Sequence, residues 1–208
     1  KEIKSEVTYI QQFVTLDEQR KLRIDEDEFP VDKYEWVLGC DGSNSSIRRF
    51  LFSDSEIIDA PTYELNGTFM DEEFTKEYKN QLVKIVFDQP GIAVGFLPLS
   101  TGKVIWFIQL AAKHFPIPSR NSSDINNLIR SLLVDAKHPL IQNTLLPRLN
   151  ESYLWKGRIL IGVDQYIKEK FVLLGDAAHL FLPFTSQGTN MAIEDVMSFV
   201  QTLESLNS

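Results

Sequence analysis

The sequence predicts an α/β fold with α+β character, and three observations support that prediction. Two short apolar runs, residues 34–40 and 171–174, each end at neighbouring Gly and Asp residues and are followed by a helical pattern. Between them, residues 83–87, 92–98 and 104–111 are apolar runs of strand length. The strand-to-helix corners are typical of open α/β sheets. The middle region predicts a β-rich domain that combines a mixed sheet with helices.

The elements expected first lie before residue 54. Residues 21–25 alternate with period two, and residues 34–40 have the profile of a buried strand. This strand should stop at Asp41-Gly42, and a helix is expected over residues 45–51 with Ser or Asn as its N-cap. Further β-forming residues in the first 38 positions are Val7, Tyr9, Ile10, Phe13 and Val14.

In the middle region, residues 100–103 give a hairpin turn signal between two of the apolar runs. A helix is expected next, with Ser123-Asp124 as its cap, and a second short helix between Pro139 and Pro147. The first of these helices has apolar residues at helical spacing, namely Ile125, Leu128, Ile129, Leu132 and Leu133.

The last elements expected are a strand over residues 158–163, a buried strand over 171–174 and a helix over 187–203. The buried strand ends at Gly175-Asp176. The helix carries Ala192, Val196, Phe199, Val200 and Leu203 on one side.

Composition narrows the function classes. The chain has 208 residues, with 21 Lys+Arg against 29 Asp+Glu, so the formal net charge of −8 argues against a nucleic-acid partner. The single Cys40 excludes an internal disulfide framework and a multi-Cys zinc site. No apolar segment approaches the roughly 20 residues of a membrane helix, and no secretory signal pattern opens the chain. We expect no metal site, no membrane partner and a cytoplasmic location.

Both corners place a carboxylate where a buried strand ends, which is where ligands bind in open α/β sheets. Asp41 and Asp176 are these residues. A carboxylate there can accept charge-assisted hydrogen bonds from ribose or ribityl hydroxyls. The start of the following helix offers free N–H groups to a phosphate or an electron-rich ring.

The two corners together resemble the motifs of the FAD-dependent aromatic hydroxylases of the p-hydroxybenzoate hydroxylase fold. Residues 41–48 resemble the family's Asp-Gly-x-x-Ser-x-x-Arg motif. Residues 175–179 and 183–190 resemble its Gly-Asp-Ala-Ala-His motif and the following Pro…Gly-Gln-Gly-x-Asn segment. The resemblance covers most of the chain, from about Val31 to Leu203, and implies a partial Rossmann-like FAD-binding domain.

The resemblance also implies roles for individual residues. Asp176 would hydrogen-bond the FAD ribityl chain, and the backbone of Gly188, Thr189 and Asn190 would face the flavin pyrimidine edge. Pro183 would shape the loop beside the ring.

In the first motif, Asp41 and Arg48 would border the pyrophosphate region and take part in FAD and NAD(P)H binding. Gly42 and Gly175 belong to the same cofactor-binding set. No residue is assigned a catalytic role.

The implied reaction is NAD(P)H-dependent reduction of FAD, addition of O2 at flavin C4a, and transfer of one oxygen from the hydroperoxide to an organic, aromatic substrate. Two alternatives stay open. One is a related flavin scaffold with another reaction, a reductase or a halogenase, although no Trp-x-Trp of halogenases is present. The other is a non-catalytic binding module.

The chain departs from the family pattern in two places. Ser186 stands where the family has the first Gly of Gly-Gln-Gly, and Ser resists a positive φ. The opening Gly-x-Gly-x-x-Gly of the family is missing, because no two of the ten glycines are two positions apart. We therefore expect an internal fragment that binds FAD weakly or not at all, is inactive alone, and self-associates through the face the missing segment would cover.

The resemblance predicts two domains. Residues 1–53 and 169–208 would form part of the FAD-binding domain, and residues 54–168 the substrate-binding domain. His179 is expected to be a structural histidine. Core packing is also the expected role of the aromatic residues that could instead line a substrate cavity, namely Phe96, Trp106, Phe181 and Phe184.

Overall fold

The computed structural model describes residues 11–12, 14–17, 21–24, 27–79, 81–182 and 185–206. The expected β-formers Val7, Tyr9, Ile10 and Phe13 lie outside these ranges, as does Pro183. The chain divides into two compact units: unit 1, Lys1–Ile58 with Arg158–Ser208, and unit 2, Asp59–Gly157.

The sheet of unit 1 that contains both predicted corners has the strand order β10-β11-β4. β4 (Val37–Gly39) and β11 (Phe171–Leu173) are parallel, with Val37 opposite Phe171 and Gly39 opposite Leu173. β10 (Ile167–Lys168) pairs antiparallel with β11. The parallel pair is the α/β element that the sequence predicts at residues 34–40 and 171–174.

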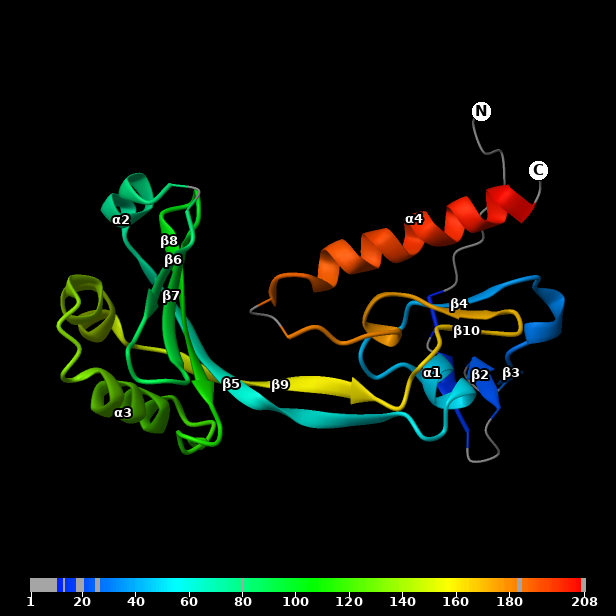
Figure 1. The fold of residues 1–208 in the computed structure, drawn as a ribbon, viewed down its shortest axis with the longest axis horizontal. Helices are drawn as coiled ribbons and strands as arrows, with labels where there is room; N and C mark the ends of the chain where they lie inside the picture. Colours follow the sequence, from blue (N-terminus) through cyan, green and yellow to red (C-terminus); the bar gives the residue numbers. More distant parts are fainter. Residues whose placement is uncertain are drawn as a thin grey trace. The chain divides into compact units, whose positions relative to one another are not determined.

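Each parallel strand leads into a turn and then a helix. α1 (Ser46–Leu51) packs on β4 because Gly39 has no side chain: a Cβ there would lie 2.9 Å from Leu173 and 3.0 Å from Ile47. α4 (Gly188–Leu206) lies along the same sheet (Figure 1), with Phe199 meeting Trp36 edge to face at 5.8 Å.

A second small sheet of unit 1 precedes β4. Its strands are β1 (Val14–Leu16), β2 (Leu22–Ile24) and β3 (Asp27–Glu28), and the 3₁₀ turn η1 (Val31–Lys33) follows. The alternation of residues 21–25 is confirmed as strand β2, with Leu22 buried in the core of unit 1.

Unit 2 is built on a sheet of order β6-β7-β8-β5-β9. The three ladders with a described register, β6–β7, β7–β8 and β8–β5, are antiparallel, where the sequence suggests a mixed sheet. The strands are β5 (Glu56–Met70), β6 (Val83–Val86), β7 (Ile92–Pro98), β8 (Lys103–Ala111) and β9 (Ser152–Ile161). The chain passes from one compact unit to the other inside β5 and inside β9. The domain bounds at residues 53 and 168 stay a prediction. β9 begins at Ser152, earlier than the strand that the sequence predicts over residues 158–163.

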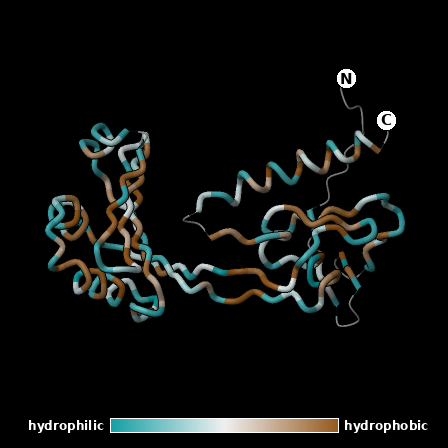
Figure 2. The backbone as a smooth tube through the Cα atoms, viewed as in Figure 1, coloured by the Kyte–Doolittle hydropathy of each residue, from teal (hydrophilic) through white to brown (hydrophobic). Residues whose placement is uncertain are grey.

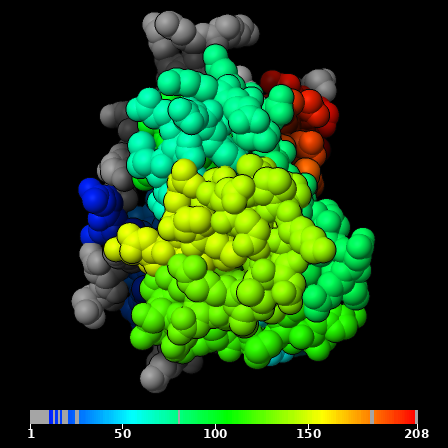
Figure 3. Space-filling model, turned by 90° about the vertical axis from the view of Figure 1, so that its left-hand side faces the viewer, coloured from blue at the N-terminus to red at the C-terminus, as the bar shows by residue number. Residues whose placement is uncertain are grey.

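Helices cover one face of this sheet. α3 (Ser122–Leu133) matches the helix expected from Ser123-Asp124, and the segment between Pro139 and Pro147 forms the π-helix η2 (Leu140–Leu145), continued by the 3₁₀ turn η3 (Leu146–Arg148). α2 (Glu72–Glu77) is a further short helix, capped by Asp71. Figure 3 shows α2 and the 112–150 segment forming the outer surface of this unit.

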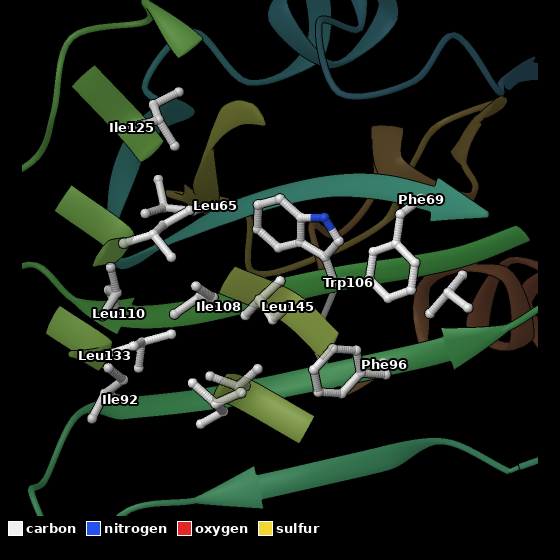
Figure 4. Packing of buried hydrophobic residues seen from close by; sticks show 14 of the residues in the cluster. Leu65, Phe69, Ile92, Phe96, Trp106, Ile108, Leu110, Ile125, Leu133 and Leu145 are labelled. Atoms are coloured by element: carbon white, nitrogen blue, oxygen red, sulfur yellow. The ribbon is translucent and has the colours of Figure 1, made fainter. Parts of the chain in front are cut away.

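The core of unit 2 lies between that sheet face and the helices. Figure 4 shows Trp106, Phe96, Leu65 and Ile125 pointing into one shared interior, each at most 1% exposed. The apolar strand positions appear brown in Figure 2. Phe96 and Trp106 are therefore core residues, as expected.

None of the helices in the described ranges combines the length and apolar character that crossing a bilayer requires.

Candidate functional site

The first corner follows β4, and its carboxylate is committed to a helix cap. Asp41 Oδ2 accepts hydrogen bonds from the backbone N–H of Ser46 at 2.6 Å and of Ile47 at 3.3 Å. Ser45 Oγ accepts from the N–H of Arg48 at 2.9 Å. Asp41 therefore satisfies the orphan amides of α1 and supports its start. Gly42 turns the chain with φ +75°, and no atom lies within 4 Å of a Cβ built there.

Arg48 joins the first corner to the second. Its side chain is 2% exposed, and Nη1 donates to the carbonyl oxygens of Ala177 at 3.0 Å and Asp176 at 3.4 Å. Nη2 donates to the Ser43 carbonyl at 2.5 Å. Burial is the main cause that lowers the pKa of Arg48, with Asp41 acting in the opposite sense. Arg48 thus links the two corners through backbone carbonyls of its own chain. Its position next to the pyrophosphate region, implied by the resemblance, stays a prediction.

The second corner follows β11 and leaves its carboxylate free. Gly175, with φ +60°, opens the 3₁₀ turn η4 (Gly175–Ala177). Asp176 is exposed, and among the described residues only its backbone carbonyl, not its carboxylate, takes part in a hydrogen bond. Its Oδ1 lies 3.9 Å from a Cβ built on Gly188, so the carboxylate faces the start of α4. The two carboxylates of the motifs therefore differ in role.

The start of α4 supplies the amides that the resemblance implies. Gly188, Thr189 and Asn190 form its first turn, and the first backbone bond into the helix is from Met191 N–H to the Gln187 carbonyl at 2.9 Å. Within the described ranges, the N–H groups of residues 188–190 have no acceptor, as expected for a helix start.

Ser186 has φ +54°, the left-handed region that favours glycine. The departure from the family pattern thus falls at a position whose backbone conformation favours glycine. The Ser186 side chain is exposed.

Sequence reasoning missed Asp195 on α4. Its Oδ2 accepts from the Gly175 backbone N–H at 2.7 Å and lies 2.9 Å from His179 Nε2. The His179 ring meets Tyr166 and Phe181 edge-on at 5.7 and 5.0 Å, which confirms a structural histidine. Asp195 lies seven residues after Gly188, on the same helical face, and that spacing is the signal that could have identified it.

Cys40 lies at the end of β4 beside this network. Burial, followed by the charges of Asp41 and Asp195, raises the pKa of its thiol, which disfavours the reactive thiolate. In the part of the chain that the structure describes, no group of three His, Cys, Asp or Glu residues is arranged to hold a metal ion.

The structure brings Asp176 close to Gly188 at the start of α4, and Arg48 donates hydrogen bonds to the backbone of the η4 turn that carries Asp176. Asp41 and Gly42 belong to the first corner, where Asp41 faces α1. Phe181 is 37% exposed and contacts His179, while Phe184 and Pro183 lie outside the described residues.

Comparison with known proteins places this site in a family. A family model described as "FAD binding domain" matches residues 21–207. The chain is 26% identical over 171 residues to 3-amino-4-hydroxybenzoate 2-monooxygenase of Streptomyces cremeus, covering 81% of this chain and 41% of that protein. It is 26% identical over 188 residues to kynurenine 3-monooxygenase of Caenorhabditis elegans, covering 85% and 39%.

A solved structure agrees with the fold. A protein of Photorhabdus luminescens, described as an FAD-containing monooxygenase, matches with a TM-score of 0.69 at 20% identity, over 94% of this chain and 57% of that one. The chain spans about two fifths of the length of the two curated relatives above.

Proposed function

The chain belongs to the FAD-binding domain family, and from this membership we propose that it is part of a flavin-dependent monooxygenase. The enzyme would use FAD and NAD(P)H and insert one oxygen atom of O2 into a small organic, aromatic substrate. The single observation that carries the proposal is the exposed Asp176 carboxylate, which has no hydrogen-bond partner among the described residues and faces the start of α4. The curated relatives support it, since both are named as monooxygenases of aromatic compounds.

The residues present fit FAD. An exposed carboxylate without a hydrogen-bond partner among the described residues suits the hydroxyls of a ribityl chain. The free amides of residues 188–190 and the positive end of a 19-residue helix suit an electron-rich ring edge. Bound FAD would supply the redox and oxygen chemistry, for which protein side chains have no equivalent.

The chain's own residues would then bind and orient. Asp176 would hold the cofactor by accepting hydroxyl hydrogen bonds, and Gly175 and Gly188 would let the backbone approach it closely. Asp41 and Arg48 would act indirectly, by holding the two corners in place. Gly42 leaves open space at the first corner.

We assign the cofactor to residues 1–53 and 169–208 and substrate binding to residues 54–168. The helix-covered core and broad sheet of unit 2 support a rigid binding scaffold.

The sharpest test compares Asp176→Asn with Asp164→Asn in the full-length gene product, since both change one exposed aspartate of unit 1 to the neutral amide. Flavin fluorescence titration should show FAD affinity lowered about tenfold or more by Asp176→Asn, because a charge-assisted acceptor is lost, and unchanged by Asp164→Asn. Equal affinities would contradict the site. Absence of any flavin binding by the unmodified protein would contradict the function.

The reaction itself is tested with ¹⁸O₂. NADH and NADPH would be supplied in turn with an aminohydroxybenzoate as probe, chosen from the name of a relative. We expect coupled NAD(P)H oxidation and one ¹⁸O atom in the product. Hydrogen peroxide formation with no labelled product would contradict the proposed oxygen insertion for this substrate class.

Two further proposals concern the protein's surroundings. α4 exposes Ile193, Val196, Met197 and Val200 at helical spacing, and this stripe supports self-association, which light scattering over a concentration series would measure.

The acidic charge and the lone Cys40 support a cytoplasmic location, which cell fractionation would test.

A further inference from the structure

Asp195 holds both ends of the turn that carries Asp176. One oxygen, Oδ2, receives the Gly175 N–H at 2.7 Å and pairs with His179 Nε2 at 2.9 Å. The turn is closed on itself as well, since the N–H groups of Ala178 and His179 donate to the Gly175 carbonyl at 2.9 and 3.0 Å. The exposed fractions of the two side chains are only 18% for Asp195 and 13% for His179. A single carboxylate oxygen therefore fixes a preformed turn onto α4.

The three residues of α4 that face the turn, Gly188, Ala192 and Asp195, follow one another along the helix. A Cβ on Gly188 would be 3.9 Å from Asp176 Oδ1, and a Cβ on Gly175 would be 3.4 Å from the Ala192 Cβ. Residues 188, 192 and 195 are spaced i, i+4 and i+7, and so share one helical face. Because Asp195 anchors the turn two helical turns beyond Gly188, it sets how far Asp176 lies from the first amides of the helix.

The contact between His179 and Asp195 depends on which ring nitrogen of His179 carries the hydrogen. Its Nδ1 is buried and has no hydrogen-bond partner among the described residues. A hydrogen on Nε2 satisfies Asp195, while a hydrogen on Nδ1 would be buried without an acceptor. The geometry thus favours the neutral Nε2–H tautomer.

We propose that Asp195 is a positioning residue for the cofactor, which, through Gly175 and His179, holds the Asp176 carboxylate opposite the amide groups at the start of α4. This inference rests on the proposed function, because Asp176 and residues 188–190 are the groups assigned to FAD there. Asp195 itself would not touch the cofactor; it would act through the turn that it holds.

The first test needs no cofactor. In the 208-residue chain, Asp195→Asn keeps the shape of the side chain but removes the charge, and Glu194→Gln makes the same change on the exposed neighbour. We expect amide exchange at Gly175 to be at least about tenfold faster in Asp195→Asn, because a bond to a charged acceptor is weakened, and unchanged in Glu194→Gln. Unchanged exchange at Gly175 in Asp195→Asn would overturn the proposal.

A measurement on the unmodified chain covers the case in which Asp195→Asn fails to fold. The ¹⁵N shifts of the His179 ring report its tautomer directly. A hydrogen on Nε2 and a nitrogen without hydrogen at Nδ1 support the anchor, and the opposite tautomer overturns it.

The cofactor readout separates this inference from the proposed function. In the full-length gene product, Asp195→Asn should weaken FAD binding and shift the visible absorption of bound flavin, whereas Glu194→Gln should do neither. If the unmodified protein binds no FAD, the proposed function fails while the exchange and tautomer results still judge the anchor. If it binds FAD and Asp195→Asn changes neither affinity nor spectrum, the positioning role fails alone.

Discussion

The two units stabilise their interiors in different ways. Unit 2 has a continuous apolar core, in which Trp106, Phe96 and Leu65 are at most 1% exposed. Unit 1 has a smaller apolar cluster, and near it the buried Arg48 guanidinium donates to three backbone carbonyls. The side chains of the unit 2 core are enclosed by their neighbours, whereas the Asp176 carboxylate in unit 1 is exposed and has no hydrogen-bond partner among the described residues. The comparison indicates that the two corners of unit 1 are positioned by hydrogen bonds, and the interior of unit 2 by apolar packing.

The largest expected effect tests the packed unit. Trp106→Ala removes a side chain that is 1% exposed and should lower the free energy of unfolding by about 3–5 kcal/mol, because transfer and cavity costs add. Chemical denaturation with segment-resolved hydrogen exchange would measure it, and we expect the loss in residues 59–157. A loss below about 1 kcal/mol would mean that the unit 2 core is loosely packed.

The next effect tests the polar unit. Arg48→Met keeps most of the side-chain volume but leaves the carbonyls of Ser43, Asp176 and Ala177 without their donor, at a cost of about 2–4 kcal/mol. The same exchange experiment should show faster opening at both corners of unit 1. Arg120→Met, at an exposed position, is the control and should change stability by less than about 0.5 kcal/mol. If Arg48→Met left the free energy of unfolding unchanged, the stability of unit 1 would come from its apolar cluster.

The smallest effect has the opposite sign. Ser186→Gly should raise the free energy of unfolding by about 0.5–1 kcal/mol, because glycine adopts φ +54° without the penalty of a Cβ. The same substitution inside α4, Ser198→Gly, should lower it by about 0.5–1 kcal/mol. Thermal denaturation of the pair gives the comparison. Loss of stability in Ser186→Gly would show that the serine hydroxyl makes a stabilising contact that outweighs the backbone strain.

The sequence predicted the corners well because each is local. A buried strand, adjacent Gly and Asp residues and a helix start follow one another within about twenty residues at each corner, so β4–α1 and β11–α4 could be placed without tertiary information. The role of Arg48 could not be predicted, since its acceptors at Asp176 and Ala177 lie 128 and 129 residues away.

Two elements of unit 2 were missed for physical reasons. β5 contains Pro61 and Gly67, which usually interrupt strands. Gly67 is required there, because a Cβ would lie 2.6 Å from Trp106 and from the Glu151 carbonyl. α2 has one buried residue, Phe74, and no apolar stripe to indicate a helix.

The parallel pairing of β4 with β11 has a consequence for synthesis. Val37 can pair with Phe171 only after Phe171 has been synthesised, 171 − 37 = 134 positions later. The sheet that contains β4 and β11 cannot form before then. All residues of unit 2 have been made by Gly157. During translation unit 2 can therefore fold while the corners after β4 and β11 are still separate, and pairings of such high sequence separation form slowly. We therefore expect the sheet of unit 2 to form before β4 pairs with β11.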